Sequence, residues 1–588
     1  MTTLLYKKMK RLLIQLSLLL LAFGTANAAP VSPVRAEMAA KQYLQAETGR
    51  AVSLKQVADP LYMTKSASAE PAYYIFEAQG GGFVIIAGDD RLSPVIGWSD
   101  KGNFDVAHMP DHVASWLAMW RDIADAMRSG RLKSASGTAS EWEEIEMGRT
   151  PVYAAAKTLE TARWGQGTPY NNFCPNNSVA GCVAVATAIV MRYHEWPPRG
   201  QGELPSYTYT DNQGVTRQED AITLGREYAW DNMPLELDDS TPIDAQDEVA
   251  KLIHETGVMV QSNYNPDGTG AYTSDVYGGL VKYYFYDAGT FQYYKEYYTD
   301  NQWHQMLVDN IDRVGPVLYS GYSETDGHAF VLDGYNAQGQ FRINFGWNGN
   351  YDGYYNFPAF DEFTKGHSAI LNIKKDEGGS VAEGLYIDGN GREQGLTCEE
   401  TDFEVGKEFN VECKYLFNLS SRMFDGEIAL GVLHRDGTIG ELVDVDSIMI
   451  IAFGGYSILY EECVLEENIL IGDRLCMFFR SSNTPEWTRI LANVEEGNSS
   501  EIPIADAKSI EEVTSIRYTA NSGILVISTK KDASWKIEDS DGTSYTDGVT
   551  FEEGVLTVDT NQFRKDSYNL TLSKGYDSKT VEIIFGKK

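Results

Sequence analysis

Cys182 stands at the start of a long apolar run that ends at Trp196-Pro197. Capping residues and a glycine precede it, so we predict a buried helix that begins near Cys182. A cysteine at a helix N-terminus lies against unsatisfied N–H groups and the positive end of the helix dipole, which lowers its pKa and favours the thiolate. A thiolate is the form that a nucleophile needs. The alternative is a buried structural cysteine, the commoner fate of a lone cysteine beside small apolar residues.

His328 is the candidate base for this thiolate, because it opens an apolar strand directly after a turn. It follows Cys182 by 146 residues (328 − 182), within the roughly 130 to 150 residues that separate the two groups in papain-type peptidases. On the next expected strand, Asn344 could orient the imidazole and Trp347 could wall the site. Each residue alone is more often structural, so the hypothesis depends on the set.

Gln166 precedes Cys182 by sixteen residues (182 − 166) in a glycine-rich loop. Its amide and the Cys182 backbone N–H together could form an oxyanion hole. A lone glutamine in such a loop is ordinarily a solvated turn residue. The order Gln166, Cys182, His328, Asn344 matches the papain-like order of roles and favours the catalytic interpretation.

The N-terminus is typical of a secretory signal peptide. Basic residues precede an apolar run over Leu12–Phe23, and Ala26-Asn27-Ala28 forms a small-residue cleavage signal. The run is shorter than the roughly 20 residues that a transmembrane helix needs, so we expect no retained transmembrane segment. We therefore expect a mature protein that is secreted or at the cell surface.

The net charge argues against nucleic-acid binding, and the cysteine spacing argues against a metal site. The 588 residues include 84 acidic and 49 basic ones, a formal charge of −35, which repels phosphate and argues against nucleic acid as a partner. The six cysteines lack C-x-x-C or zinc-finger spacing, so we expect no metal site and no cofactor. A disulfide between Cys174 and Cys182 is the alternative to a reactive Cys182. Two bridges are open to the four late cysteines, Cys398, Cys413, Cys463 and Cys476.

The elements that must position these residues belong to an α+β protein with three to five domains. A helix over Val34–Gln45, two strands over 72–78 and 82–88, and a helix over His112–Met127 precede a Ser- and Gly-rich linker over Ser129–Ser140. Helices then mix with aromatic-rich strands to about residue 375. Beyond it, short strand-like runs at Ile428, Leu475 and Ile524 indicate all-β modules that meet between residues 505 and 511.

At its motifs the chain resembles the streptopain family of secreted papain-like cysteine peptidases, over roughly residues 30–375. The matching segments are Trp164-Gly165-Gln166, Gly181-Cys182-Val183-Ala184, Gly327-His328-Ala329-Phe330, Asn344-Phe345-Gly346-Trp347, and the propeptide-like run over residues 82–97. The chain has Phe345 where streptopain has tryptophan. The last third lies outside the resemblance.

The resemblance implies a zymogen in which Cys182 is the nucleophile, His328 its partner and Gln166 part of the oxyanion hole. Gly327 and Gly270, the latter in the loop Asp267–Ala271, would contact substrate through backbone groups, and Trp347 would border a hydrophobic subsite. The N-terminal domain would block the papain-like site as an intramolecular inhibitor until cleavage removes it. Protein or peptide substrates are the expected partners.

These observations together predict a secreted cysteine endopeptidase made as a zymogen. We expect a signal peptide over 1–28, a propeptide over 29–150, the papain-like domain over 151–375, a β-sandwich over 376–508, and a small β domain over 509–588 with a sorting or surface-associated role. Two other functions fit the same residues: an adhesive surface protein with an inactive peptidase-like domain, and a related thiol acyltransferase.

Overall fold

A computed structural model gives the fold of this chain. It describes residues 30–57, 70–107, 109, 111–132, 134, 138–149, 157–322, 327–356, 365–388, 395–400, 403, 405–466, 472–493, 498–504, 515–519, 524–528, 534–539, 542–546, 549–552, 555–559, 567–574 and 577–584. The expected signal peptide, residues 1–28, and the expected junction at residues 505–511 lie outside these residues. Among the helices that are described, none combines the length and the apolar character needed to cross a bilayer.

The N-terminal region, residues 30–149, is a small α+β unit. Its helices are α2 (Pro33–Thr48), α3 (Asp111–Arg128) and α4 (Thr138–Glu146), and its strands are β1 (Leu54–Val57), β2 (Tyr73–Ala78), β3 (Phe83–Ala87) and β4 (Val95–Ser99). Ser32 caps α2 by accepting a hydrogen bond from the Arg35 N–H at 3.2 Å, and Gly49 ends the helix in the left-handed conformation. These elements confirm the two helices and the two strands expected here.

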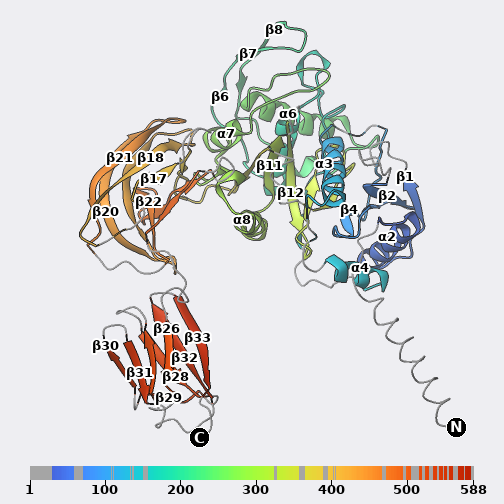
Figure 1. Cartoon of the computed structure of the whole chain (residues 1–588). Coiled ribbons are helices and arrows are strands. Elements are labelled where there is room, and N and C mark those ends of the chain that lie inside the picture. The colour runs from blue at the N-terminus through green and yellow to red at the C-terminus, as the bar shows by residue number, and fades with distance from the viewer. Residues whose placement is uncertain are drawn as a thin grey trace, which may run out of the picture. The chain divides into compact units, whose positions relative to one another are not determined.

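The prediction of a linker over Ser129–Ser140 is partly wrong, because helix α4 begins at Thr138. This helix packs against α2, as Figure 1 shows at the N-terminal end of the ribbon. Trp142 is buried and its Nε1–H donates to the Leu92 carbonyl at 2.9 Å. The buried tryptophan anchors a helix whose start the Ser and Gly composition conceals.

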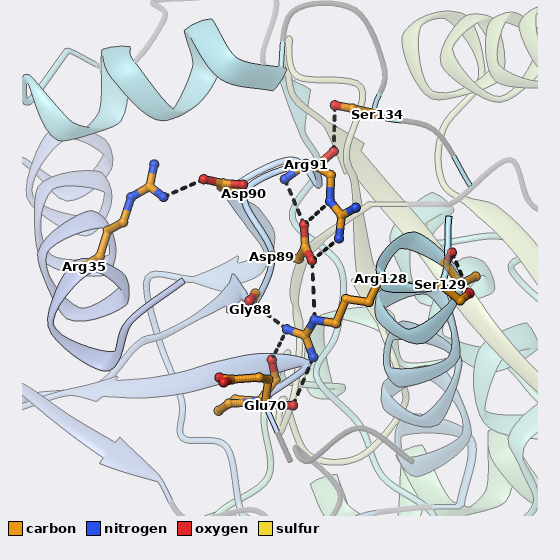
Figure 2. A network of polar contacts seen from close by, with 11 residues as sticks. Arg35, Glu70, Gly88, Asp89, Asp90, Arg91, Arg128, Ser129 and Ser134 are labelled. Carbon is orange, nitrogen blue, oxygen red and sulfur yellow. Dashed lines mark hydrogen bonds and ion pairs between the residues drawn. The ribbon is translucent and has the colours of Figure 1, made fainter. Parts of the chain in front are cut away.

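A polar cluster centred on Asp89 fastens α3 to the N-terminal sheet (Figure 2). Arg128, the last residue of α3, donates to the main-chain carbonyls of Glu70, Pro71 and Gly88 at 2.7–3.0 Å and pairs with Asp89. Arg91 donates two further hydrogen bonds to the Asp89 carboxylate. Burial alone would raise the pKa of Asp89, but the hydrogen bonds and charges of the two arginines outweigh it and lower that pKa. Asp89 is therefore held as a buried anion that joins three segments of the region.

The central region contains the sequence motifs. Its helices are α5 (Cys182–His194), α6 (Ile243–Met259), α7 (Ser274–Tyr284) and α8 (Asp300–Arg313), with single 3₁₀ turns at Pro175–Asn177, Trp230–Asn232 and Lys295–Tyr297. Its larger strands are β10 (Phe291–Tyr294), β11 (Val317–Tyr322), β12 (Gly327–Tyr335), β13 (Phe341–Asn344), β14 (Gly353–Tyr355) and β15 (Lys365–Leu371). Shorter ones are β5 (Lys157–Thr158), β6 (Glu203–Leu204), β7 (Tyr207–Thr210), β8 (Thr216–Glu219) and β9 (Ile222–Thr223).

The N-terminal and central regions share one sheet. The described strands run in the order β1-β2-β3-β4-β14-β13-β12-β11-β15-β10, with β5 paired to β12, and the pairing is antiparallel throughout. The two regions join where β4 pairs with β14, with Trp98 opposite Tyr354 and Gly97 opposite Tyr355. Two strands, β14 and β13, therefore separate the N-terminal region from β12.

The region after residue 380 begins with a β-sandwich. One sheet has the order β17-β18-β16-β24 with β21 on β18, and the other has β20-β19-β22-β23 with β25 on β22. Its strands are β16 (Leu385–Ile387), β17 (Leu396–Cys398), β18 (Glu408–Asn418), β19 (Phe424–Leu433), β20 (Ile439–Ile450), β21 (Gly455–Val464), β22 (Arg474–Ser481), β23 (Thr488–Arg489), β24 (Leu491–Ala492) and β25 (Glu501–Pro503). A shared apolar core that includes Val411, Ile428 and Met477 lies between the sheets.

Two four-stranded sheets follow, in the orders β26-β27-β31-β30 and β29-β28-β32-β33. The strands are β26 (Ser515–Thr519), β27 (Ile524–Ser528), β28 (Ser534–Glu538), β29 (Ser544–Tyr545), β30 (Val549–Glu552), β31 (Val555–Asp559), β32 (Ser567–Lys574) and β33 (Asp577–Ile584). Ile537, Leu556 and Leu570 belong to their common core. The α+β fold class with all-β modules at the C-terminal end is thus confirmed.

Candidate active site

Cys182 is the first residue of α5. Gly181 precedes it at φ 91°, and a Cβ at Gly181 would lie 2.9 Å from the Thr269 Cγ2 and 3.0 Å from the Thr269 carbonyl oxygen. Glycine therefore meets both the backbone conformation and the close approach of the neighbouring loop. Cys182 is partly buried at the end of the helix where the N–H groups have no helical partner. The expected position of the thiol at a helix N-terminus is the observed one.

All six cysteines lie in described parts of the chain, and none forms a disulfide. Burial raises the pKa of Cys174 to about 12, and the nearby Glu219 carboxylate adds to that shift. Cys174 is therefore a thiol and not a thiolate at neutral pH. The disulfide alternatives for the middle pair and for the four late cysteines are absent from this structure.

His328 is the second residue of β12, directly opposite Gly321 of β11. Helix α5 packs against β12 and β11. It also packs against α6, where Thr256 Oγ1 donates to the Ala184 carbonyl at 2.9 Å. The helix that begins with Cys182 and the strand that begins next to His328 are thus direct neighbours.

Aromatic rings enclose the imidazole of His328. The rings of Phe330 and Phe345 stack near it, with centroids 5.9 and 6.4 Å away and interplanar angles of 27°. Burial lowers the pKa of His328 to about 3, and a hydrogen bond to the Phe345 main chain opposes that shift only in part. Since the bond favours the charged ring, the ring donates and the Phe345 carbonyl accepts. The imidazole is neutral at neutral pH, the state that can accept a proton.

Gln166 lies in a loop that is tied to the segment before Cys182. Its carbonyl accepts a hydrogen bond from the Ala180 N–H at 2.9 Å, and the residue is 6% exposed. Its side-chain amide makes no hydrogen bond to another described residue. A Cβ at the preceding Gly165 would lie 2.3 Å from Asn348 Oδ1, and the Asn348 N–H donates to the Trp164 carbonyl at 3.1 Å. The glutamine loop therefore contacts both the Cys182 loop and the loop after β13.

Asn344, the last residue of β13, is fully buried and its amide is engaged in local hydrogen bonds. Nδ2 donates to Thr161 Oγ1 at 3.1 Å and to the Ala162 carbonyl at 2.8 Å, while Oδ1 accepts from the Gly346 N–H at 3.1 Å. These bonds fix the turn that carries Phe345 and Trp347. That Asn344 orients His328 stays a prediction, and the Phe345 carbonyl is the acceptor seen on the ring.

Of the three residues expected to bind substrate, Gly270 and Trp347 lie in loops and Gly327 begins strand β12. Gly270 forms a bridge with Asn263, and the adjacent Thr269 Oγ1 donates to the Val179 carbonyl at 2.6 Å. This loop therefore packs on the segment before Cys182, and the position of a Cβ at Gly270 is open space. Gly327 is exposed at the start of β12, and Trp347 is partly buried in the turn after β13. That turn packs on the first part of α5, since a Cβ at Gly346 would lie 3.2 Å from Val185 Cγ1.

Two residues that contact His328 or its neighbour Phe345 have no role assigned to them from the sequence. Phe330 follows His328 by two positions on a strand, so period-two alternation places both on one face and could have identified it. Asp352 accepts a hydrogen bond from the Phe345 N–H at 2.9 Å, and no local sequence signal marks that contact. Within the described residues, no cluster of three or more His, Cys, Asp or Glu side chains is placed to hold a metal ion.

Comparison with known proteins assigns the two regions. Residues 164–355 match the Peptidase C10 family, and residues 28–123 match the family described as Spi protease inhibitor. The structure of a prointerpain A fragment from Prevotella intermedia is 30% identical, covers 55% of this chain and 99% of its own, and superposes with a TM-score of 0.43. The chain belongs to the Peptidase C10 family. This membership confirms the expected resemblance to streptopain.

Two further relatives extend the comparison. Streptopain of Streptococcus pyogenes is 27% identical over 332 residues, which is 51% of this chain and 80% of streptopain. The thiol protease/hemagglutinin PrtT of Porphyromonas gingivalis is 28% identical over 359 residues, or 59% of this chain. The matched part spans 41% of PrtT, less than half of that protein. This C10 chain thus joins an inhibitor-like N-terminal region to a cysteine peptidase region.

Proposed function

We propose that this protein is a secreted cysteine endopeptidase that is made as a zymogen and acts through Cys182 and His328. One observation carries the proposal: Cys182 begins a helix that packs on the strand carrying His328, within a segment that matches the Peptidase C10 family. The secretory N-terminal pattern supports export of the protein.

In the proposed mechanism, His328 takes the proton of the Cys182 thiol, and the sulfur attacks the carbonyl carbon of the peptide bond. The charge that develops on the carbonyl oxygen is stabilised by the Gln166 amide and the Cys182 N–H. The protonated imidazole then gives its proton to the leaving amine as the C–N bond breaks. Water, deprotonated by His328, attacks the thioester and releases the acid and the Cys182 thiol. No cofactor enters these steps.

The contact between the N-terminal region and β14 supports intramolecular inhibition. Besides the β4–β14 pairing, the Tyr351 hydroxyl donates to the Asp105 carbonyl at 2.7 Å, and the Asn356 N–H donates to the Ile96 carbonyl at 3.0 Å. The ring centroids of Trp116 in α3 and Tyr355 are 4.9 Å apart, and those of Tyr355 and Phe345 are 5.6 Å apart. The inhibitor-like region thus reaches, through one further ring, the aromatic residue beside His328.

Protein and peptide substrates would bind through the loops around Cys182. Gly327 and Gly270 would present backbone groups to an extended chain, and Trp347 would border a subsite for an apolar side chain. Broad substrates fit this arrangement better than a single target. Cleavage of a peptide library with no preference two residues before the cut would contradict the apolar subsite.

The test compares the purified precursor with its Cys182→Ala variant, each incubated with reductant. We expect the wild type alone to lose roughly 120 to 130 residues from its N-terminus, the length of the expected propeptide over residues 29–150, and to digest casein. New N-termini in the products identify a peptidase, whereas cross-links or hydroxamates would identify an acyltransferase. A precursor that stays inactive after its N-terminal region has been trimmed would contradict the proposal in favour of a binding protein.

A further inference from the structure

The turn between β13 and β14 is closed by a buried carboxylate. It spans residues 345–352 and contains four residues with positive φ, namely Gly346, Asn348, Gly349 and Tyr351. Two of these, Asn348 and Tyr351, are not glycine, so the backbone is held in a conformation that such residues seldom adopt. At the end of the turn, Asp352 Oδ1 accepts the Phe345 N–H at 2.9 Å. The carboxylate therefore holds the two ends of the turn together.

Phe345 is bonded at both of its main-chain polar groups. Its N–H goes to Asp352, and its carbonyl accepts the hydrogen bond from the His328 ring. Its side chain stacks beside the same imidazole. Any rotation of this residue would move the His328 acceptor and the stacking ring together. Asp352 is thus linked to the imidazole of His328 through a single residue, Phe345.

The surroundings of Asp352 disfavour the charged form of its carboxyl group. The residue is 3% exposed, and Oδ2 is buried without a hydrogen-bond partner in the described part of the chain. Burial raises the pKa of Asp352 to about 7, with Asp333 adding to the shift and Arg342 and Arg163 opposing it. Arg342 is itself paired with Asp333 at 2.5 Å. An unsatisfied buried oxygen costs stability and calls for an explanation, which the contact of this carboxylate with Phe345 supplies.

We propose that Asp352 is a positioning residue for His328, which it orients through the main chain of Phe345. The carboxylate would do indirectly what an orienting side chain does by direct contact with the catalytic histidine. Asp352 touches neither substrate nor the reacting atoms. This inference rests on the proposed Cys182–His328 mechanism, and it assigns the orienting function to the Phe345 carbonyl in place of the Asn344 amide.

The test measures how the reactivity of Cys182 depends on pH. The full-length chain is alkylated with iodoacetamide between pH 4 and 9, before and after a trace of active wild-type enzyme has processed it, and Cys182 labelling is followed by mass spectrometry of its peptide. Burial raises the pKa of Cys174, Cys398, Cys413 and Cys476 to about 12 and that of Cys463 to about 11, so these thiols label slowly in this range.

Three variants separate positioning from stability. Asp352→Ala removes the acceptor, whereas Asp352→Asn keeps an oxygen at the same place. The matched control is Asp287→Ala, because Asp287 is also 3% exposed and closes a turn by accepting the Gly289 N–H at 2.8 Å, away from Phe345. Thermal unfolding of each variant is measured beside the labelling and the cleavage of a fluorogenic peptide.

We expect Asp352→Ala to lose the labelling of Cys182 below neutral pH and to lower kcat on the order of 10²-fold with little change in KM. Asp352→Asn should restore both, and Asp287→Ala should lower the melting temperature without altering either. If His328→Ala alters the pH dependence of Cys182 labelling but Asp352→Ala leaves it as in the wild type, this inference alone is overturned. A wild-type profile unaffected by His328→Ala would overturn the proposed Cys182–His328 mechanism as well.

Discussion

Trp98 of β4 and Tyr354 of β14 are register partners, and their rings stack with centroids 5.1 Å apart at an interplanar angle of 14°. The first residue belongs to the inhibitor-like region and the second to the peptidase region. The N-terminal region is therefore bound to β14 by main-chain pairing and by a ring contact. The same sheet continues from β14 through β13 to β12. Release of this region would leave β14 as an edge strand of the peptidase sheet.

Loosening the β4–β14 pairing should activate the precursor. Gly97 has no room for a side chain, since a Cβ would lie 2.6 Å from the Tyr355 ring. We expect Gly97→Val to speed the conversion of precursor several-fold and to leave the processed enzyme unchanged, because residue 97 is then removed. The measurement is the rate of precursor loss on gels, with Lys55→Ala on the outer strand β1 as control. A precursor that converts at the wild-type rate would show that this pairing does not limit activation.

The Asp89 cluster should decide the stability of the N-terminal region. Arg128→Ala would leave Asp89 with Arg91 alone and would remove the shared donor of three main-chain carbonyls. Hydrogen bonds to charged groups each contribute about 1.5–3 kcal/mol, so we expect faster hydrogen exchange and trypsin cleavage within residues 30–128. Arg128→Lys should not restore protection, because an ammonium lacks the planar fork of the guanidinium.

The comparison is made in a Cys182→Ala background, so that self-digestion does not contribute to the cleavage pattern. Arg149→Ala is the control, because the exposed Arg149 side chain pairs with the exposed Glu144 at the end of α4 and contacts Met147 Sδ, both outside the Asp89 cluster. Equal protection in Arg128→Ala and Arg149→Ala would contradict the role assigned to the cluster.

Local signals explain what could be predicted from the sequence. The glycine before Cys182 and the apolar run after it specify the helix start, and the turn before His328 specifies a strand start. These signals depend on neighbours in the chain, so the bounds of α5 and the position of His328 in β12 followed from them. That Asn344 belongs to the site stays a prediction, and the hydrogen bonds of its buried amide serve the turn that it precedes.

Long-range contacts leave no comparable signal. Trp98 and Tyr354 are 256 residues apart (354 − 98), and nothing near either residue indicates that they share a ladder. Likewise, Asp352 follows a turn rich in Asn, Gly and Tyr that is typical of a solvated loop, yet its carboxylate is buried against the Phe345 N–H. Strand pairing between regions and the closure of this turn depend on tertiary packing and could not be inferred from composition.

Acid should destabilise the fold through His194. Burial lowers the pKa of His194 to about 4 from the ordinary value of 6.5, and its buried Nε2 has no hydrogen-bond partner among the described residues. As pH falls from 6.5 to 4, the unfolded chain binds a proton that the folded chain excludes, so stability falls across that window. His194→Phe removes the titration and keeps an apolar ring near Tyr193 and Tyr286.

Between pH 7 and pH 5 we expect the unfolding free energy of the wild type to fall by about 1–2 kcal/mol more than that of His194→Phe. Urea unfolding in the Cys182→Ala background measures the difference, and other titrating groups cancel between the two proteins. Parallel dependences on pH would mean that His194 does not titrate in the folded state as inferred.

Gln166 should contribute to turnover and little to binding or stability. Its carbonyl holds the Ala180 N–H, a bond that Gln166→Ala retains, while the side-chain amide has no described hydrogen-bond partner to lose. Loss of one oxyanion donor costs about 10²- to 10³-fold in kcat, so we expect a fall of that size with KM nearly unchanged. Kinetics on a fluorogenic peptide, normalised to the fraction of Cys182 that iodoacetamide labels, measures the effect. Gln201→Ala is the matched control, since the side chain of this exposed glutamine donates to the Lys282 carbonyl. A rise in KM with kcat intact would instead place Gln166 among the groups that bind substrate in its ground state.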